Sequence, residues 1–273
     1  MLKKKTDCGV ALVTGASTGI GRASAEALAK AGFTVFGTSR KPTDNGPQGV
    51  TMLTADVTNE ASVKQLIDDV LAETGRIDVL VNNAGLGMLG GAEESSVSQV
   101  QALFDVNVFG VMRMTNAVLP VMRQHGKGHI INMSSVLGLV PAPYSAHYAS
   151  TKHALEGYSE SLDHEARAFN VRVSLIETAY TRSSFDDNSF EPNSKLPEYD
   201  KIRADVQGFA RKAMMTGDAP EEVAKIVVKA ATDPQPKRRY TAGKTARKIS
   251  ILRRFAPAKM FDKIFRKELQ LPA

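Results

Sequence analysis

Short and almost wholly apolar runs alternate with segments of helical periodicity along most of this chain. A strand that is apolar along its whole length has both faces covered, which is typical of parallel sheets. Right-handed crossovers between such strands predict an α/β fold, a single doubly wound parallel sheet with helices on both faces. The predicted strands are residues 8–13, 33–39, 50–55, 77–81, 128–134 and 171–177, with helices at 21–32, from about 58, at 98–124 and at 146–168.

The length of 273 residues and a hydrophobic content of 42% fit one domain with a full core. Cys8 is the lone cysteine of the sequence, so an internal disulfide and a cysteine metal cluster are excluded, and we predict no metal site. The first apolar run is too short for a signal peptide or a membrane span. We therefore expect a cytoplasmic protein.

The net charge of +6 is unevenly distributed. Residues 233–273 carry twelve basic and three acidic side chains, a net of +9, which leaves −3 for the rest. The basic character therefore belongs to the tail, and no nucleic-acid-binding surface is predicted. We divide the chain into a domain of residues 1–243, with an insertion at 182–216, and a basic amphipathic extension at 244–273.

The extension predicts a helix whose apolar face carries Met260, Phe261, Ile264 and Phe265. A basic amphipathic helix can lie on an anionic membrane surface. Apolar stripes are more often buried in protein, so packing on the insertion or on a second subunit is the favoured interpretation.

A glycine-rich turn follows the first strand and opens the first helix. Glycines permit a tight turn, and the free N–H groups of the helix N-terminus attract a pyrophosphate. This strand–turn–helix context predicts a Rossmann-like dinucleotide site. Its predicted cofactor-binding residues are Gly15, Ser17, Thr18, Gly19, Ile20 and Gly21.

The second strand ends in Ser39 and Arg40, where an acidic residue would bind the ribose 2′-hydroxyl of NAD. A guanidinium instead donates two hydrogen bonds to a phosphate. We therefore predict that the cofactor is NADP(H).

Tyr148 and Lys152 lie four residues apart and share one face of a predicted helix. A nearby ammonium favours tyrosinate and lowers the pKa of the phenol, as a general acid–base residue requires. Ser135 ends the fifth strand, thirteen residues before Tyr148, and Asn82-Asn83-Ala84-Gly85 follows the fourth.

With these motifs in this order, residues 10–233 resemble the short-chain dehydrogenase/reductase family. The resemblance implies that Tyr148 is the general acid in reduction and the base in oxidation, assisted by Lys152. It also implies that Ser135 orients the substrate carbonyl and that Asn107 supports a proton relay. Thr178-Ala179 departs from the Pro-Gly that the family usually has there.

The same resemblance implies further cofactor contacts. Asp56 and Val57 would bind adenine, and Thr181 would meet the nicotinamide amide. The segment Asn83, Ala84 and Gly85 would line the adenosine ribose.

Mostly apolar residues beside the predicted catalytic groups suggest a lipophilic ketone, aldehyde or alcohol as substrate. The predicted pocket consists of Leu86, Met88, Leu137, Leu139, Val140, Tyr144, Phe185 and Met214. The length and tail resemble branches near the 17β-hydroxysteroid and retinol dehydrogenases.

The alternative function is a catalytically silent NADP(H)-binding regulator on the same fold. A sugar-nucleotide epimerase and an enoyl reductase fit the motif spacing less well. The family resemblance also implies a homodimer or homotetramer, formed through the long helices at 98–124 and 146–169.

Overall fold

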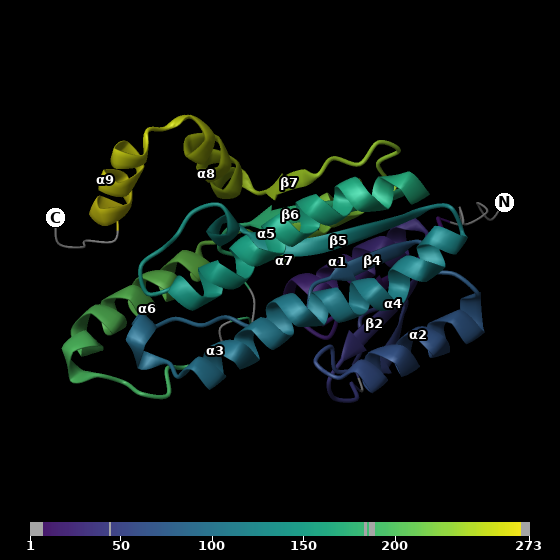
Figure 1. The fold of residues 1–273 in the computed structure, drawn as a ribbon, viewed down its shortest axis with the longest axis horizontal. Coiled ribbons are helices and arrows are strands. Elements are labelled where there is room, and N and C mark those ends of the chain that lie inside the picture. The colour runs from purple at the N-terminus through teal and green to yellow at the C-terminus, as the bar shows by residue number, and fades with distance from the viewer. Residues whose placement is uncertain (1–7, 44, 183–184, 186–188, 269–273) are drawn as a thin grey trace.

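The computed structural model describes residues 8–43, 45–182, 185 and 189–268, and within them seven parallel strands form one sheet (Figure 1). The strand order is β3-β2-β1-β4-β5-β6-β7, so the chain winds outward from β1 in both directions. This confirms the predicted doubly wound sheet. The strands are β1 (Val10–Val13), β2 (Thr34–Ser39), β3 (Val50–Thr54), β4 (Val79–Asn82), β5 (Gly128–Ser135), β6 (Val171–Thr178) and β7 (Arg239–Ala242).

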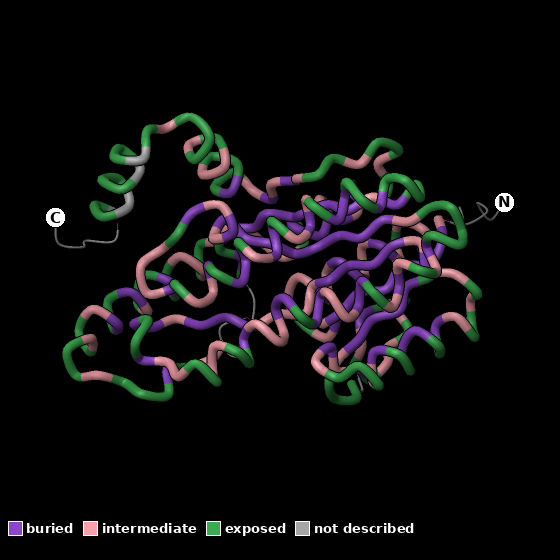
Figure 2. Tube along the Cα trace, in the orientation of Figure 1, coloured by how far each residue is buried: buried purple, intermediate pink, exposed green. Residues whose placement is uncertain are grey.

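Helices cover both faces of the sheet and leave the strands buried between them (Figure 2). On one face α1 (Gly19–Ala31) packs beside α7 (Pro220–Thr232) over a core that includes Leu28 and Val227. The other face is covered by α2 (Glu60–Thr74), α4 (Gly110–Gln124) and α5 (Ala146–Ala166). Because β1, β4 and most of β5 are buried, their sequences show no alternation of apolar and polar residues.

The predicted helix at 98–124 is interrupted by a wider turn. It consists of α3 (Val97–Phe104), a π-helical turn at Asp105–Phe109 and then α4. A single π turn inserts an extra residue without ending the helix, so hydrophobic periodicity does not reveal it. The turn contains Asn107, which the family resemblance had singled out.

Three segments hold structure that the sequence did not predict, and one of them is the helix α7 described above. The insertion at 182–216 contains a helix, α6 (Asp200–Met215), and the charged stretch after α7 contains the edge strand β7. After β7 the chain forms α8 (Lys244–Phe255) and α9 (Ala258–Glu268). In Figure 1 these last two helices extend away from the sheet, beyond the carboxyl end of β7.

Candidate active site

The glycine-rich turn has a backbone that only glycine tolerates at two of its positions. Gly15 and Gly19 have φ angles of +64° and +54°. A Cβ atom on Gly21 would lie 2.1 Å from the carbonyl oxygen of Gly15, so this position has no room for a side chain. The turn thereby places the N-terminus of α1 at the carboxyl end of β1, where its N–H groups can bind a pyrophosphate.

Thr14 fixes the glycine turn to the segment that follows β4. Its hydroxyl oxygen accepts hydrogen bonds from the N–H groups of Asn83 and Ala84, both at 3.0 Å. The Asn83 amide donates in return to the carbonyl oxygens of Thr14 and Gly15, at 2.9 and 3.0 Å. Thr14 was not among the predicted site residues, because one threonine at a strand end carries no distinctive sequence signal.

The end of β2 presents the predicted 2′-phosphate residues. Arg40 is exposed, and the Ser39 hydroxyl donates to the carbonyl of Lys41. Asp56 lies across from them. Burial alone would raise its pKa, but two hydrogen bonds from Thr58 and the charge of Arg40 hold it below the ordinary value. Asp56 is therefore a fixed anion beside the cationic end of β2.

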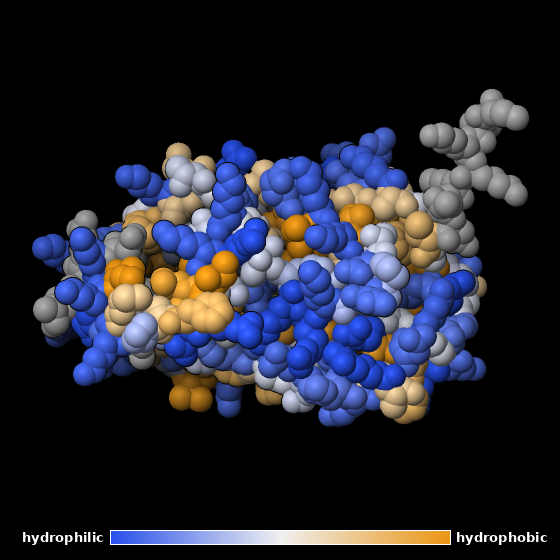
Figure 3. Space-filling model, turned by 90° about the horizontal axis from the view of Figure 1, so that it is seen from above, coloured by the Kyte–Doolittle hydropathy of each residue, from blue (hydrophilic) through white to orange (hydrophobic). Residues whose placement is uncertain are grey.

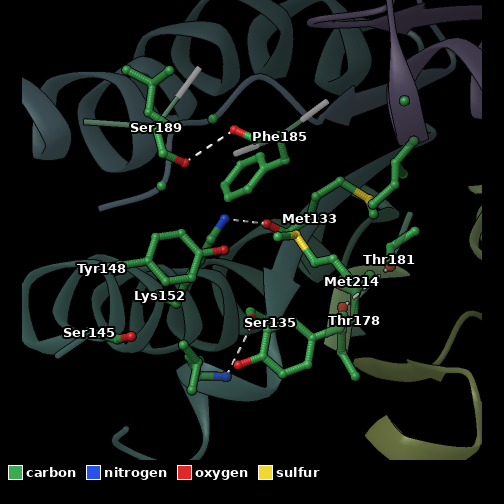
Figure 4. A pocket seen from close by; sticks show the side chains of 18 of the residues that line it. Met133, Ser135, Ser145, Tyr148, Lys152, Thr178, Thr181, Phe185, Ser189 and Met214 are labelled. Carbon is green, nitrogen blue, oxygen red and sulfur yellow. Dashed lines mark hydrogen bonds between the residues drawn. The ribbon is translucent and has the colours of Figure 1, made fainter. Parts of the chain in front are cut away.

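The predicted acid–base residues come from β5 and α5 and meet at one wall of a cavity (Figure 4). Burial raises the pKa of Tyr148 well above its ordinary value, in contrast to the lowering that the sequence predicted, and the Ser135 side chain opposes this shift only in part. Lys152 donates from Nζ to the carbonyl oxygen of Met133 at 2.8 Å, with Nζ 5.6 Å from the centre of the Tyr148 ring. Burial lowers the pKa of Lys152 to about 8, although the charge of Glu156 opposes this shift.

Asn107 is 1% exposed and does not line the cavity. Its amide donates to the carbonyl of Leu86 at 2.8 Å and to the Thr151 hydroxyl at 3.2 Å, and its oxygen accepts from the Leu86 N–H at 2.8 Å. The π turn thus ties the segment after β4 to the catalytic helix α5. The proton relay expected of Asn107 remains a prediction.

A buried acidic cluster lies one helical turn beyond Lys152. Burial raises the pKa of Glu156 to about 7, even though the Ser134 hydroxyl donates to it and Arg239 lies 2.7 Å from its Oε2. Arg239 also pairs with the buried Glu177, at 2.8 Å. Sequence reasoning missed this cluster, although Glu156 continues the four-residue spacing of Tyr148 and Lys152 and could have been noticed.

The cavity has a volume of about 1110 Å³ and extends from the glycine turn past Tyr148 to α6, α8 and α9. The predicted cofactor-binding residues line it throughout, Thr181 included. Thr181 is held there by a bridge to Asp218 and by a hydrogen bond from its hydroxyl to the carbonyl of Ala179, at 3.3 Å.

Six of the eight predicted substrate-pocket residues also line the cavity. They are Leu86, Met88, Leu137, Val140, Phe185 and Met214. Leu139 and Tyr144 do not line it: the carbonyl of Leu139 accepts from Arg253 at 3.0 Å, and the Tyr144 ring packs edge-on against Tyr199 at 6.1 Å. Apolar lining residues outside the predicted pocket include Val206, Phe209 and Ala210 of α6 and Ile249, Leu252 and Ile264 of the last two helices.

One buried ion pair attaches the insertion to the loop after β4. Glu94 is 0% exposed and pairs with Arg203 of α6, which is 7% exposed. Glu94 also accepts from the N–H groups of Gly91 and Leu196, at 2.7 and 2.9 Å. Burial opposes ionisation, but these hydrogen bonds and the Arg203 charge hold the pKa of Glu94 below its ordinary value.

The short chain dehydrogenase family model matches residues 9–194, and the chain belongs to this family. Members of this family are oxidoreductases whose fold binds a nicotinamide cofactor. Among the described residues, no helix is long and apolar enough to cross a membrane. The same residues contain no group of three or more potential His, Cys, Asp or Glu metal ligands.

Two relatives and two solved structures are similar over most or much of the chain. A 3-ketodihydrosphingosine reductase of Bacteroides thetaiotaomicron is 44% identical over 66% of each chain. Retinol dehydrogenase 8 of Bos taurus is 33% identical over 82% of this chain and 78% of its own.

A short-chain dehydrogenase from Streptomyces avermitilis has a TM-score of 0.80 at 33% identity, covering 96% of this chain and 94% of its own. A short chain dehydrogenase/reductase from Burkholderia phymatum, solved in complex with NAD, has a TM-score of 0.79 at 29% identity. It covers 98% of this chain and 97% of its own.

Proposed function

We propose that this protein is an NADP(H)-dependent oxidoreductase that interconverts a lipophilic ketone or aldehyde and its alcohol, with Tyr148 as the general acid–base residue. One observation carries the proposal. A single cavity joins the glycine turn, where a dinucleotide phosphate fits, to Ser135 and Tyr148, which both line it. A cofactor that extends from the turn toward Tyr148 would bring its reactive end beside an acid and a substrate-sized space.

The chain's own residues fit such a cofactor. The N-terminus of α1 would hold the pyrophosphate, the end of β2 the adenosine ribose, and Asp56 the adenine. Lys152 and Thr181 lie on the cavity wall farther in, where they would hold the nicotinamide ribose and amide. When bound, the cofactor supplies the hydride in reduction and accepts it in oxidation.

Tyr148 would provide the proton in reduction. Its raised pKa keeps the phenol protonated at neutral pH, so the site is prepared to act as an acid. The Ser135 hydroxyl holds the substrate carbonyl oxygen, and the Tyr148 O–H bond breaks as that oxygen takes the proton and becomes a hydroxyl. The Lys152 ammonium then stabilises the remaining phenolate, and oxidation runs the same steps backwards.

The cofactor preference rests on charge at the end of β2. Ser39, Arg40 and Lys41 offer donors and positive charge to a 2′-phosphate, and β2 does not end in the acidic residue that would bind a ribose 2′-hydroxyl. The ordinary pKa of a phosphate keeps it anionic at neutral pH, so this end of the strand favours NADP(H) over NAD(H).

The substrate class rests on the apolar wall beyond Tyr148. Phe185 packs edge-on against the Tyr148 ring at 6.0 Å, and Phe209 and Met214 line the space from α6. Two relatives bear the names of a ketodihydrosphingosine reductase and a retinol dehydrogenase, both of which denote lipophilic substrates. We further propose a cytoplasmic homodimer or homotetramer assembled through α4 and α5.

The test is the change in absorbance of NADPH and NADH with a panel of apolar and polar ketones, for the wild type and Tyr148→Phe. We expect NADPH oxidation with bulky apolar ketones, and a loss of about 10²–10⁴-fold in kcat/KM for Tyr148→Phe. Phe keeps the ring and its packing, so cofactor binding measured by fluorescence should persist. Tight NADPH binding with no turnover of any ketone or alcohol would instead support the silent-regulator function.

A further inference from the structure

The last two described helices form a strongly basic arm at the mouth of the cavity. We define the C-terminal arm as residues 244–268, comprising α8 and α9. It carries nine basic and two acidic side chains, a net charge of +7, while the rest of the chain carries −1. Figure 1 shows the arm extending from the body, and Figure 2 shows that much of it is exposed.

Large apolar side chains are exposed within this basic surface. Ile251 and Phe255 of α8 are 52% and 74% exposed, and Met260 and Ile264 of α9 are 46% and 38% exposed. Each pair is four residues apart and therefore shares one helix face. Figure 3 views the molecule from the side of the arm and shows apolar side chains gathered among hydrophilic ones there.

This exposure differs from the packing that the sequence favoured. Ala246 is buried, and α8 contacts β7, but the four apolar side chains above are not covered by the insertion. The side chains of Phe261 and Phe265, also predicted for the apolar face, lie outside the described part of the structure. Something other than the domain itself must therefore cover these four exposed apolar side chains.

The arm also forms part of the cavity wall. Lys248, Leu252 and Ile264 line the cavity, so the exposed helices and the proposed substrate space share residues. A second hollow, of about 410 Å³, lies beside it on α8 and is lined by Lys244, Arg247, Lys248, Ile251 and Leu252. An apolar molecule that reached the arm would therefore be next to the cavity.

We propose that the C-terminal arm docks on the surface of an anionic lipid bilayer and places the cavity mouth against it. Basic side chains bind the anionic headgroups, and Phe255, Met260 and their neighbours enter the boundary between headgroups and acyl chains. If the proposed function holds, a lipophilic substrate then passes between bilayer and cavity without crossing water.

Charge and chemistry favour a bilayer over the other occupants. A second copy carries the same +7 arm, so pairing of arms is repulsive. A nucleic acid would neutralise the charge, but it would leave the exposed apolar pairs in water. An anionic bilayer satisfies both the charges and the apolar side chains.

Co-sedimentation of the full chain with vesicles tests this proposal. We expect binding to phosphatidylcholine vesicles that contain phosphatidylglycerol, little binding to pure phosphatidylcholine, and weakening with salt. The double variant Lys259→Glu/Lys263→Glu should bind the anionic vesicles more than about tenfold more weakly, since each basic residue contributes about 1 kcal/mol near such a surface.

The matched control makes the same charge change elsewhere. Lys30→Glu/Lys229→Glu lies at the C-terminal ends of α1 and α7, which in this fold are at the opposite end of the sheet from the cavity. This variant should bind like the wild type. Phe255→Ser should weaken binding while keeping its salt dependence, because it removes apolar contact and no charge.

Two outcomes would overturn the proposal. One is that the wild type does not bind anionic vesicles at low salt, or that both charge variants lose binding equally. The other is that Phe255→Ser leaves binding intact but converts an oligomer into a monomer in size-exclusion chromatography, which would assign the arm to a second copy. Sedimentation does not depend on turnover, so the two proposals can fail separately. A protein that oxidises NADPH but does not bind vesicles would refute the docking alone. A protein that binds vesicles but does not oxidise NADPH would refute the proposed activity alone.

Discussion

The cofactor side and the substrate side of the cavity are built in different ways. The cofactor side comes mainly from consecutive elements, β1, the glycine turn, α1 and β2, and its geometry is set by backbone constraints such as the positive φ of Gly15. The substrate side is assembled from the loop after β4, the insertion with α6, and the C-terminal arm, which are far apart in the sequence. The cofactor side is therefore specified by local sequence, whereas the substrate side depends on a few contacts between residues that are far apart in the sequence.

The largest effect is expected from breaking the Glu94–Arg203 pair, because the substrate side depends on such long-range contacts. Glu94→Ala leaves the buried Arg203 without its main counter-charge, and we expect the free energy of unfolding to fall by about 3–5 kcal/mol. Urea denaturation followed by circular dichroism measures this loss.

Asp200→Asn is the matched control, because Asp200 pairs with the same guanidinium but is 66% exposed. It should change stability by at most about 1 kcal/mol. Equal losses for the two variants would show that the buried pair is not what attaches the insertion.

The buried His129 lies in the sheet that supports both sides of the cavity, and its protonation should affect the free energy of unfolding of the whole domain. Burial lowers its pKa to about 4, with the Arg172 charge acting in the same direction and Asp163 opposing it. Between pH 4 and pH 6.5 the unfolded chain binds more protons at this residue, so stability is complete above pH 6.5 and is lost as the pH falls toward 4. The full effect is about 3 kcal/mol.

Thermal melts of the wild type and His129→Gln across this pH range measure the effect. The variant should show a shallower loss on acidification, whatever its stability at neutral pH. Parallel pH profiles would mean that other groups govern acid unfolding.

The smallest effect is expected at the cofactor side. Arg40→Asp removes a charged donor and adds repulsion toward a 2′-phosphate, so the KM for NADPH should rise by about 10–100-fold, with little change for NADH. Steady-state kinetics with both cofactors check this. Lys41→Asp makes the same charge change one residue away. An equal rise in the KM for NADPH in this variant would indicate a general electrostatic effect and not a direct contact of Arg40 with the 2′-phosphate.

The sequence predicted the cofactor side better than the substrate side for a physical reason. Gly15, Gly19 and Gly21 are required by the local backbone, so their spacing alone indicates the turn. The acid–base residues Tyr148 and Lys152 share one helix face, which spacing also reveals. The seven-stranded sheet confirmed the fold and the family model confirmed the family, whereas the residue roles remain predictions.

Partners that are distant in sequence could not be predicted in this way. Arg239 and Glu156 meet only because β7 pairs with β6 at the edge of the sheet, and β7 itself is four residues long after a charged stretch. Tyr144 was expected in the pocket because it is near Tyr148 in sequence, but its φ of +59° accompanies a turn in which its ring packs on Tyr199. Proximity along the chain indicates a shared cavity only where the backbone direction is also known.

The buried attachment of the insertion at Glu94 has a consequence for exchanging parts between relatives. Glu94 pairs with Arg203 and accepts from the N–H groups of Leu196 and Gly91, so one buried carboxylate joins the loop to the insertion at two points. Other residues of the insertion add contacts of their own, such as the hydrogen bonds of Asn193 with Ser96. A chimera that transplants the insertion from another member therefore needs an arginine at the position of Arg203 to avoid leaving the buried Glu94 without its counter-charge, and the transplanted segment would carry its own substrate preference with it.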